Sequence, residues 1–187
     1  MIATAAVLAF LLAAQAAGSP SDPQGIRCIY DTVGQERMQG YDAQIEAKTL
    51  SIEQFAAATA TDRRSCIQRG VWKHQSQVDA SFSFALSMAT FVRDGKKLQD
   101  GGINPDDVLG KWDDMPTDLR AALKAGIDGY PGGDAKFVQD IRTFLTTHTP
   151  ATRAPFLGHA LGMLSAYGAM LRAADDYAAA EAPPAAR

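Results

Sequence analysis

The stretch HQSQVDASFSFALSMATFVR (residues 74–93) contains no glycine or proline and carries apolar residues around its whole helical circumference. A helix of this kind is normally covered by neighbouring elements on several sides. Residues 81–84 alternate with a period of two, which is typical of a strand, but twenty residues without a helix breaker favour a helix. We therefore expect a central helix over 74–93 that ends at Asp94-Gly95.

Helical patterns continue on both sides of this stretch. Residues 26–46 have apolar side chains at near-helical spacing, and Ser51-Ile52-Glu53-Gln54 is typical of a capping box that opens the next helix. After an irregular stretch at 95–118, proline and glycine pairs separate the later helical segments. The predicted helices cover about 26–46, 52–69, 74–93, 105–112, 117–127, 134–148 and 152–181. The prediction is an all-α protein, an irregular bundle of about five to seven helices.

The first 16 residues are typical of a signal peptide. Residues 2–14 form an uncharged apolar run, and Ala14-Gln15-Ala16 is a small-x-small cleavage pattern. The run is shorter than the roughly 20 apolar residues that span a bilayer. No lysine or arginine precedes it, so an uncleaved N-terminal anchor is the alternative. We expect cleavage after Ala16, a periplasmic or secreted location, a single helical domain over 17–182 and a disordered tail at 183–187.

Two cysteines, Cys28 and Cys66, follow this segment. An even pair in an exported chain is most simply a disulfide, and closing a loop of this length stabilises a fold by about 3–4 kcal/mol in the chain-entropy model. A helical hairpin that turns near residue 47 would bring the two residues to the same end. However, Cys28 points to the polar side of a regular helix over 26–46. Either that helix begins later, or the second helix packs on a flank, or the cysteines pair between molecules.

Composition excludes some classes of partner. The formal net charge of −3 provides no electrostatic footprint for nucleic acid or an anionic membrane. The last helix includes Gly158 and Gly162, a spacing found in transmembrane helix dimers. Its apolar part, residues 155–171, is interrupted by polar side chains, so we expect the glycines to allow close packing on the central helix. No stable membrane span is predicted after signal cleavage.

An aromatic set stands at the predicted helix ends. It consists of Trp72, Trp112 and Tyr130. Aromatic residues at such positions can line a ligand cleft or a partner-binding patch. The alternative is that they cap the core where helices meet.

Candidate catalytic and metal-binding residues are few. His159, Met163 and Met170 share one face of the last helix and could bind Cu(I), although methionine at helical spacing is ordinarily core filler. The carboxylates of Asp113, Asp114 and Glu36 could supply acid and base groups for hydrolysis. The chain contains no motif of a known nucleophile, phosphate loop or zinc site, and no cofactor is predicted.

Three functions remain as hypotheses. The first is a non-catalytic exported protein that binds a partner protein or a small apolar ligand. The second is a cell-envelope hydrolase, which requires two of the central aspartates to converge with a histidine. The third is a copper-handling protein. The missing catalytic motifs favour the first.

Overall fold

A computed structural model describes residues 23–126, 130–149 and 155–181. Within these ranges the chain forms helices and no strand, so the predicted all-α class is confirmed. The predicted signal peptide and the predicted tail at 183–187 lie outside the described residues. The helices are α2 (Pro23–Val33), α3 (Gln35–Glu46), α4 (Ile52–Ala58), α5 (Ala60–Gln68), α6 (Gln75–Asp100), α7 (Pro105–Leu109), α8 (Thr117–Ala125), α9 (Gly133–His148) and α10 (Phe156–Glu181).

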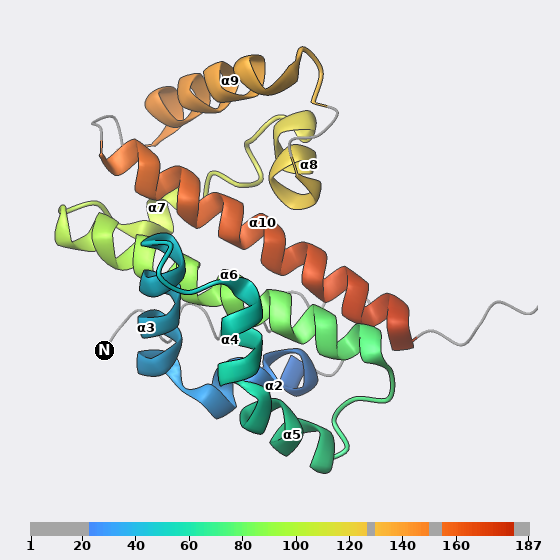
Figure 1. The fold of residues 1–187 in the computed structure, drawn as a ribbon. Helices are drawn as coiled ribbons and strands as arrows, with labels where there is room; N and C mark the ends of the chain where they lie inside the picture. Colours follow the sequence, from blue (N-terminus) through green and yellow to red (C-terminus); the bar gives the residue numbers. More distant parts are fainter. Residues whose placement is uncertain (1–22, 127–129, 150–154, 182–187) are drawn as a thin grey trace, which may run out of the picture.

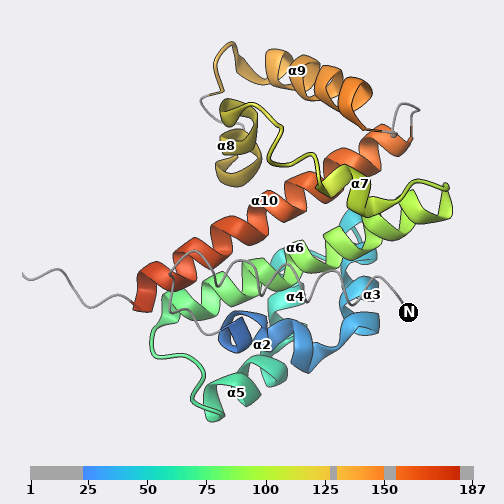
Figure 2. The same ribbon diagram turned by 180° about the vertical axis from the view of Figure 1, so that it is seen from behind.

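Two 26-residue helices, α6 and α10, form an antiparallel pair at the centre (Figure 1). The helices α2, α3, α4 and α5 lie on the far side of α6, and α8 and α9 lie on the far side of α10, as the reverse view also shows (Figure 2). Helix α6, which contains the stretch that is apolar around its whole circumference, is therefore covered by α2, α3, α7 and α10. Its central position follows from that apolar circumference.

Glycines allow α6 and α10 to approach closely. A Cβ on Gly162 would come within 3.0 Å of Asp94 Cγ on α6, and a Cβ on Gly95 would lie 3.6 Å from Met163 Sδ on α10. The predicted close packing of the last helix on the central one is therefore observed at Gly162. By contrast, a Cβ on Gly158 would meet nothing within 4 Å.

The predicted helix boundaries need three corrections. The helix expected over 26–46 is broken at Gly34, which has a φ of 85°, and the helix expected over 52–69 is broken at Thr59. These two breaks account for the larger number of helices. The central helix does not end at Asp94-Gly95 but continues to Asp100, because Gly95 is buried against α10 and does not turn the chain. The capping box at Ser51 is confirmed, with both reciprocal hydrogen bonds to Gln54.

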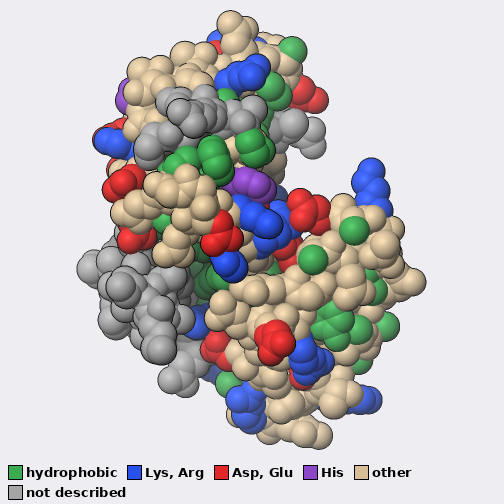
Figure 3. All heavy atoms as spheres, turned by 90° about the vertical axis from the view of Figure 1, so that its left-hand side faces the viewer, with side chains coloured by type: hydrophobic (Ala, Val, Ile, Leu, Met, Phe, Trp, Pro, Cys, Tyr) green, Lys and Arg blue, Asp and Glu red, His purple; other side chains and the backbone are tan. Residues whose placement is uncertain are grey.

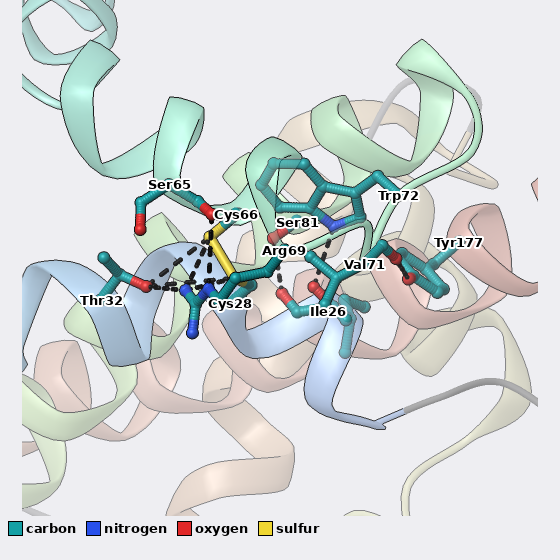
Figure 4. The surroundings of a disulfide bond; sticks show 11 residues. Ile26, Cys28, Thr32, Ser65, Cys66, Arg69, Val71, Trp72, Ser81 and Tyr177 are labelled. Carbon is teal, nitrogen blue, oxygen red and sulfur yellow. Dashed lines mark hydrogen bonds between the residues drawn. A yellow bond between two sulfur atoms is a disulfide. The ribbon is translucent and has the colours of Figure 1, made fainter.

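Cys28 and Cys66 form a disulfide between α2 and α5. Helix α2 begins before Cys28, so the polar-side position of this residue is explained by α5, which packs on that flank of α2 (Figure 4). Next to the bond, Trp72 Nε1 donates to Gly25 O at 3.0 Å and Ser81 Oγ donates to Ile26 O at 2.8 Å. The start of α2 is thus fixed to α5 and to α6.

Among the described helices, none combines the length and the apolarity that crossing a bilayer requires.

Candidate functional site

Six polar residues meet where α3, α6 and α10 cross, inside an otherwise apolar interface. We call them the junction cluster: Asp42 and Glu46 of α3, Thr90, Arg93 and Asp94 of α6, and His159 of α10. Titratable groups that converge from three elements are typical of functional sites, although structural ion-pair networks do the same.

Asp94 lies at the bottom of the cluster. It is buried, and its carboxylate accepts hydrogen bonds from the guanidinium of Arg93, at 3.3 Å from Nε to Oδ1 and 3.2 Å from Nη2 to Oδ2. His159 Nδ1 lies 2.9 Å from Oδ1. Opposite an ionised carboxylate, Nδ1 carries the proton, which leaves Nε2 of a neutral imidazole as an acceptor. The position of Gly162 leaves room for this carboxylate against the α10 backbone.

Asp42 is the second buried carboxylate and connects α3 to α6. Its Oδ1 accepts a hydrogen bond of 2.7 Å from Thr90 Oγ1, and its Oδ2 lies 2.8 Å from Arg93 Nη1. Among the described residues, no N–H group is directed along a hydrogen bond to this Oδ2 atom. Burial raises the pKa of Asp42, and the Thr90 hydrogen bond and the charge of Arg93 oppose that rise. Arg93 therefore serves two buried carboxylates, and it also pairs with Glu46 at 3.0 Å.

Three titratable side chains of the junction cluster reach the solvent. The exposed fractions are 60% for Glu46, 29% for His159 and 21% for Arg93. Figure 3 shows one face of the molecule on which a histidine lies in a hollow, with basic and acidic side chains around it. The surface therefore offers a partner both a carboxylate and an imidazole whose second nitrogen is not used by Asp94.

Of the junction cluster, the sequence singled out only His159. Thr90, Arg93 and Asp94 are spaced as i, i+3 and i+4 within an apolar helix, which places three polar side chains on one face. That spacing was the available signal. It is masked because Asp94-Gly95 is typical of a helix end. Asp42 carries no distinguishing local pattern.

The three aromatic residues lie in separate places. Trp72 packs beside α2 and donates to Gly25 O, whereas Trp112 is buried edge-on against Tyr167 of α10, with ring centroids 5.0 Å apart. Tyr130 is buried against Phe137 of α9, and its hydroxyl donates to Asp140 at 3.0 Å. The structure does not bring them together into one patch, and each packs against the core.

The candidate copper ligands lie along α10. Met163 and Met170 are buried in the core, whereas His159 is partly exposed and bonded to Asp94. Among the described residues, no group of three or more histidine, cysteine, aspartate or glutamate side chains is arranged to hold a metal ion. Copper binding through His159, Met163 and Met170 stays a prediction.

The central acidic residues are at the surface. Asp113 pairs with Arg120 and Asp114 with Lys111, and Glu36 is exposed in the first turn of α3. Among the described residues, the carboxylate that pairs with His159 is instead that of Asp94. The carboxylates that converge with His159 are therefore different from Asp113, Asp114 and Glu36, whereas the central pair Asp106 and Asp107 lines a surface depression together with His148.

Two shallow surface depressions are the other candidates for binding. One, of about 410 Å³, lies between α6 and α10 and includes Asp79 and Asp176. The other, of about 510 Å³, includes Asp106, Asp107 and His148. Both are open. The first has two aspartates among serine and alanine side chains, the second has mostly charged side chains, and Trp72, Trp112 and Tyr130 line neither.

No protein-family model matches this chain. No curated protein and no solved structure matches it either. Function must therefore be inferred from the chemistry of the residues themselves.

Proposed function

We propose that the chain is an exported, non-catalytic protein that binds a partner protein over the junction cluster. Two features support export: the apolar segment at 2–14 with its cleavage pattern, and the disulfide between Cys28 and Cys66. The location of the partner site rests on a single observation, the pair of buried carboxylates on either side of Arg93.

Burying this pair is unfavourable for the isolated chain. Taking an ion out of water costs several kcal/mol even in a real protein interior, and apolar residues of similar volume often stabilise a fold more than a buried ion pair does. Asp42 and Asp94 share one guanidinium, so their charges are not fully compensated. Groups retained at such a cost are candidates for a functional role.

The sign of the remaining charge indicates the kind of partner. Within the junction cluster, the carboxylates of Asp42, Glu46 and Asp94 outnumber the single guanidinium of Arg93. With a neutral His159, the cluster carries net negative charge. Complementary charge guides association and fixes orientation. A lysine or arginine side chain of the partner is therefore the group that the junction cluster favours.

Site-specific photo-crosslinking in the producing cells tests the proposal. A photoreactive residue replaces Ala43, which is exposed on α3 beside the cluster, or Val138, which is exposed on α9, as the matched control. We expect a defined crosslinked protein from position 43 and not from position 138. Adding Glu46→Lys to the Ala43 variant should remove the product by charge repulsion, whereas Glu46→Gln should only weaken it.

Two results would contradict this site. One is the absence of any product from position 43. The other is a product that survives Glu46→Lys while circular dichroism shows an unchanged fold. Intact mass after purification would separately report whether the signal peptide was removed, so failure of the site and failure of export are distinguishable.

A second candidate function is hydrolysis, favoured by the pairing of His159 with buried Asp94. A carboxylate on Nδ1 orients the ring and stabilises the imidazolium, as in catalytic triads. In this reading, Nε2 takes a proton from water, and the resulting hydroxide attacks an acyl carbon that is held in the hollow. Glu46 and Arg93 would orient the substrate.

Chromogenic esters and glycosides provide the test. Under the hydrolase hypothesis, His159→Gln abolishes turnover, and the matched variant His74→Gln, at an exposed residue that directly precedes α6, leaves turnover unchanged. Turnover that is equal in both variants, or absent from the wild-type protein, would exclude these substrates and leave binding as the better account.

A further inference from the structure

We infer that the Cys28–Cys66 disulfide is a reducible latch for α5, and that its reduction by a dithiol releases α5 from α2 while the other helices stay folded. A structural staple would behave differently, because its reduction would destabilise the whole fold at once.

Helix α5 has almost no apolar attachment of its own. Of its nine residues, all of them described, Cys66 is the buried one, and the apolar side chain beside it, Ile67, is 54% exposed. The helix contacts α2 and α4, and its contact with the central helices that is seen among the described side chains is that of Arg63, which lies 5.9 Å from the ring centroid of Phe82 on α6. Because apolar burial supplies most of the stability of a packed helix, the disulfide is the main attachment of α5.

The polar contacts of α5 are weak substitutes. Arg37, whose side chain is 53% exposed, pairs with the less exposed Asp62 at 3.2 Å. Arg63 Nη2 donates to Ala56 O of α4 at 2.8 Å, and Arg69, at the end of α5, donates to Thr32 Oγ1 on α2 at 2.6 Å. Exposed ion pairs contribute little because water screens them. Local opening of α5 is therefore easier than opening of the core helices.

The neighbouring helices have independent attachments. Phe55 of α4 is fully buried between Tyr41 and Phe82, with ring centroids 5.3 and 5.0 Å away. The start of α2 is held by hydrogen bonds from Trp72 and Ser81. Reduction leaves all of these contacts in place, so we expect α2 and α4 to remain docked.

A cation next to the sulfurs favours the exchange reaction. Arg69 Nη2 lies 3.0 Å from Cys28 Sγ and 3.5 Å from Cys66 Sγ (Figure 4). A guanidinium in this position stabilises a departing thiolate, and a more stable leaving thiolate departs faster. Structural disulfides do not require a positive charge beside them.

The reaction is an ordinary thiol–disulfide exchange. After a local opening of α5, a thiolate of the dithiol attacks Cys28 Sγ, and Cys66 leaves as a thiolate next to Arg69. The second thiol of the reductant then attacks the mixed disulfide and releases Cys28. Two electrons and two protons pass to the cysteines, and the reductant becomes a disulfide. The flank of α2 that carries Cys28 and Thr32 is thereby uncovered.

Hydrogen exchange of the folded, full mature chain tests the latch. Peptides covering 60–68 are compared with peptides from α6 and α10, before and after treatment with dithiothreitol. We expect at least a tenfold loss of protection in α5 and unchanged protection in α6 and α10. A parallel loss in all three helices would overturn the inference in favour of a staple, and unchanged protection in α5 would overturn it as well.

Two substitutions at one position test the role of the charge. Arg69→Lys and Arg69→Gln both lose the planar set of N–H donors of the guanidinium, but only the glutamine variant loses the positive charge. We expect dithiothreitol to reduce the lysine variant about three to ten times faster than the glutamine variant. Equal rates would refute the assistance of the cation. Arg64→Gln, on the exposed side of α5, is the matched control and should react like the wild-type protein.

Discussion

Replacing Gly162 with alanine should destabilise the fold by about 2–4 kcal/mol. The new Cβ would come within 3.0 Å of Asp94 Cγ and closer still to Oδ2. Asp94 is a short side chain held from both sides by Arg93 and His159, so it can move only by giving up these partners. Breaking a buried charge pair costs about 3–5 kcal/mol, and the better helix propensity of alanine returns about 1 kcal/mol.

The matched control lies one turn away on the same helix. Nothing lies within 4 Å of a Cβ on Gly158, which is exposed, so Gly158→Ala should stabilise the chain by up to about 1 kcal/mol. Urea titration of both variants, monitored by circular dichroism, gives the two free energies of unfolding. If Gly162→Ala is as stable as Gly158→Ala, the close contact with Asp94 does not hold the junction cluster together.

Three further predictions concern other parts of the chain. Burial raises the pKa of Asp42, so the folded chain binds the proton of this carboxyl more tightly than the unfolded chain does. Protonation of Asp42 therefore stabilises the fold increasingly as the pH falls from neutral through the raised pKa of the folded state. This stabilisation is complete below the ordinary pKa of 3.8. Asp42→Asn should remove this increment, and equal changes in unfolding free energy between pH 7 and pH 4 for both proteins would disprove it. Phe55→Ala should cost about 3–5 kcal/mol, whereas Ile52→Ala, at an exposed position of the same helix, should change stability by less than about 0.5 kcal/mol in the same titration. Intact mass spectrometry of protein made from the full gene should give the mass of residues 17–187 less two protons, and a full-length mass would argue against signal cleavage.

The helical architecture was predictable because its main signal is local. The apolar circumference of residues 74–93 identifies the central helix without knowledge of its neighbours. The break in the first helical segment is a different case. Gly34 and Gly40 lie in the same helical pattern, yet only Gly34 leaves the helix, with a φ of 85°, while Gly40 remains within α3. Local propensity, which is the same for both glycines, does not distinguish them.

The junction cluster was largely hidden for a related reason. An aspartate followed by glycine is a common helix ending, so the local sequence at Asp94 predicts the end of the helix. Its partner His159 is 65 residues further along the chain, and Asp42 precedes Asp94 by more than 50 residues. Pairings at such separations leave no pattern in a single sequence. The disulfide could be predicted because cysteine chemistry limits the possible partners to one.

The contact between Tyr177 and the region around α2 has a consequence for how the chain folds. Tyr177 Oη bonds to Val71 O, 106 residues earlier, and its ring packs against Gly25. The longest interface, between α6 and α10, likewise cannot form until the last helix has been synthesised. Contacts between residues so far apart in the sequence slow folding, because the chain loses the entropy of loop closure before these contacts can stabilise it. A nascent chain that lacks its final helix cannot form this interface, and an incompletely folded chain is the form that a translocation channel can accept. For an exported protein, late closure by α10 would delay folding until most of the chain has crossed.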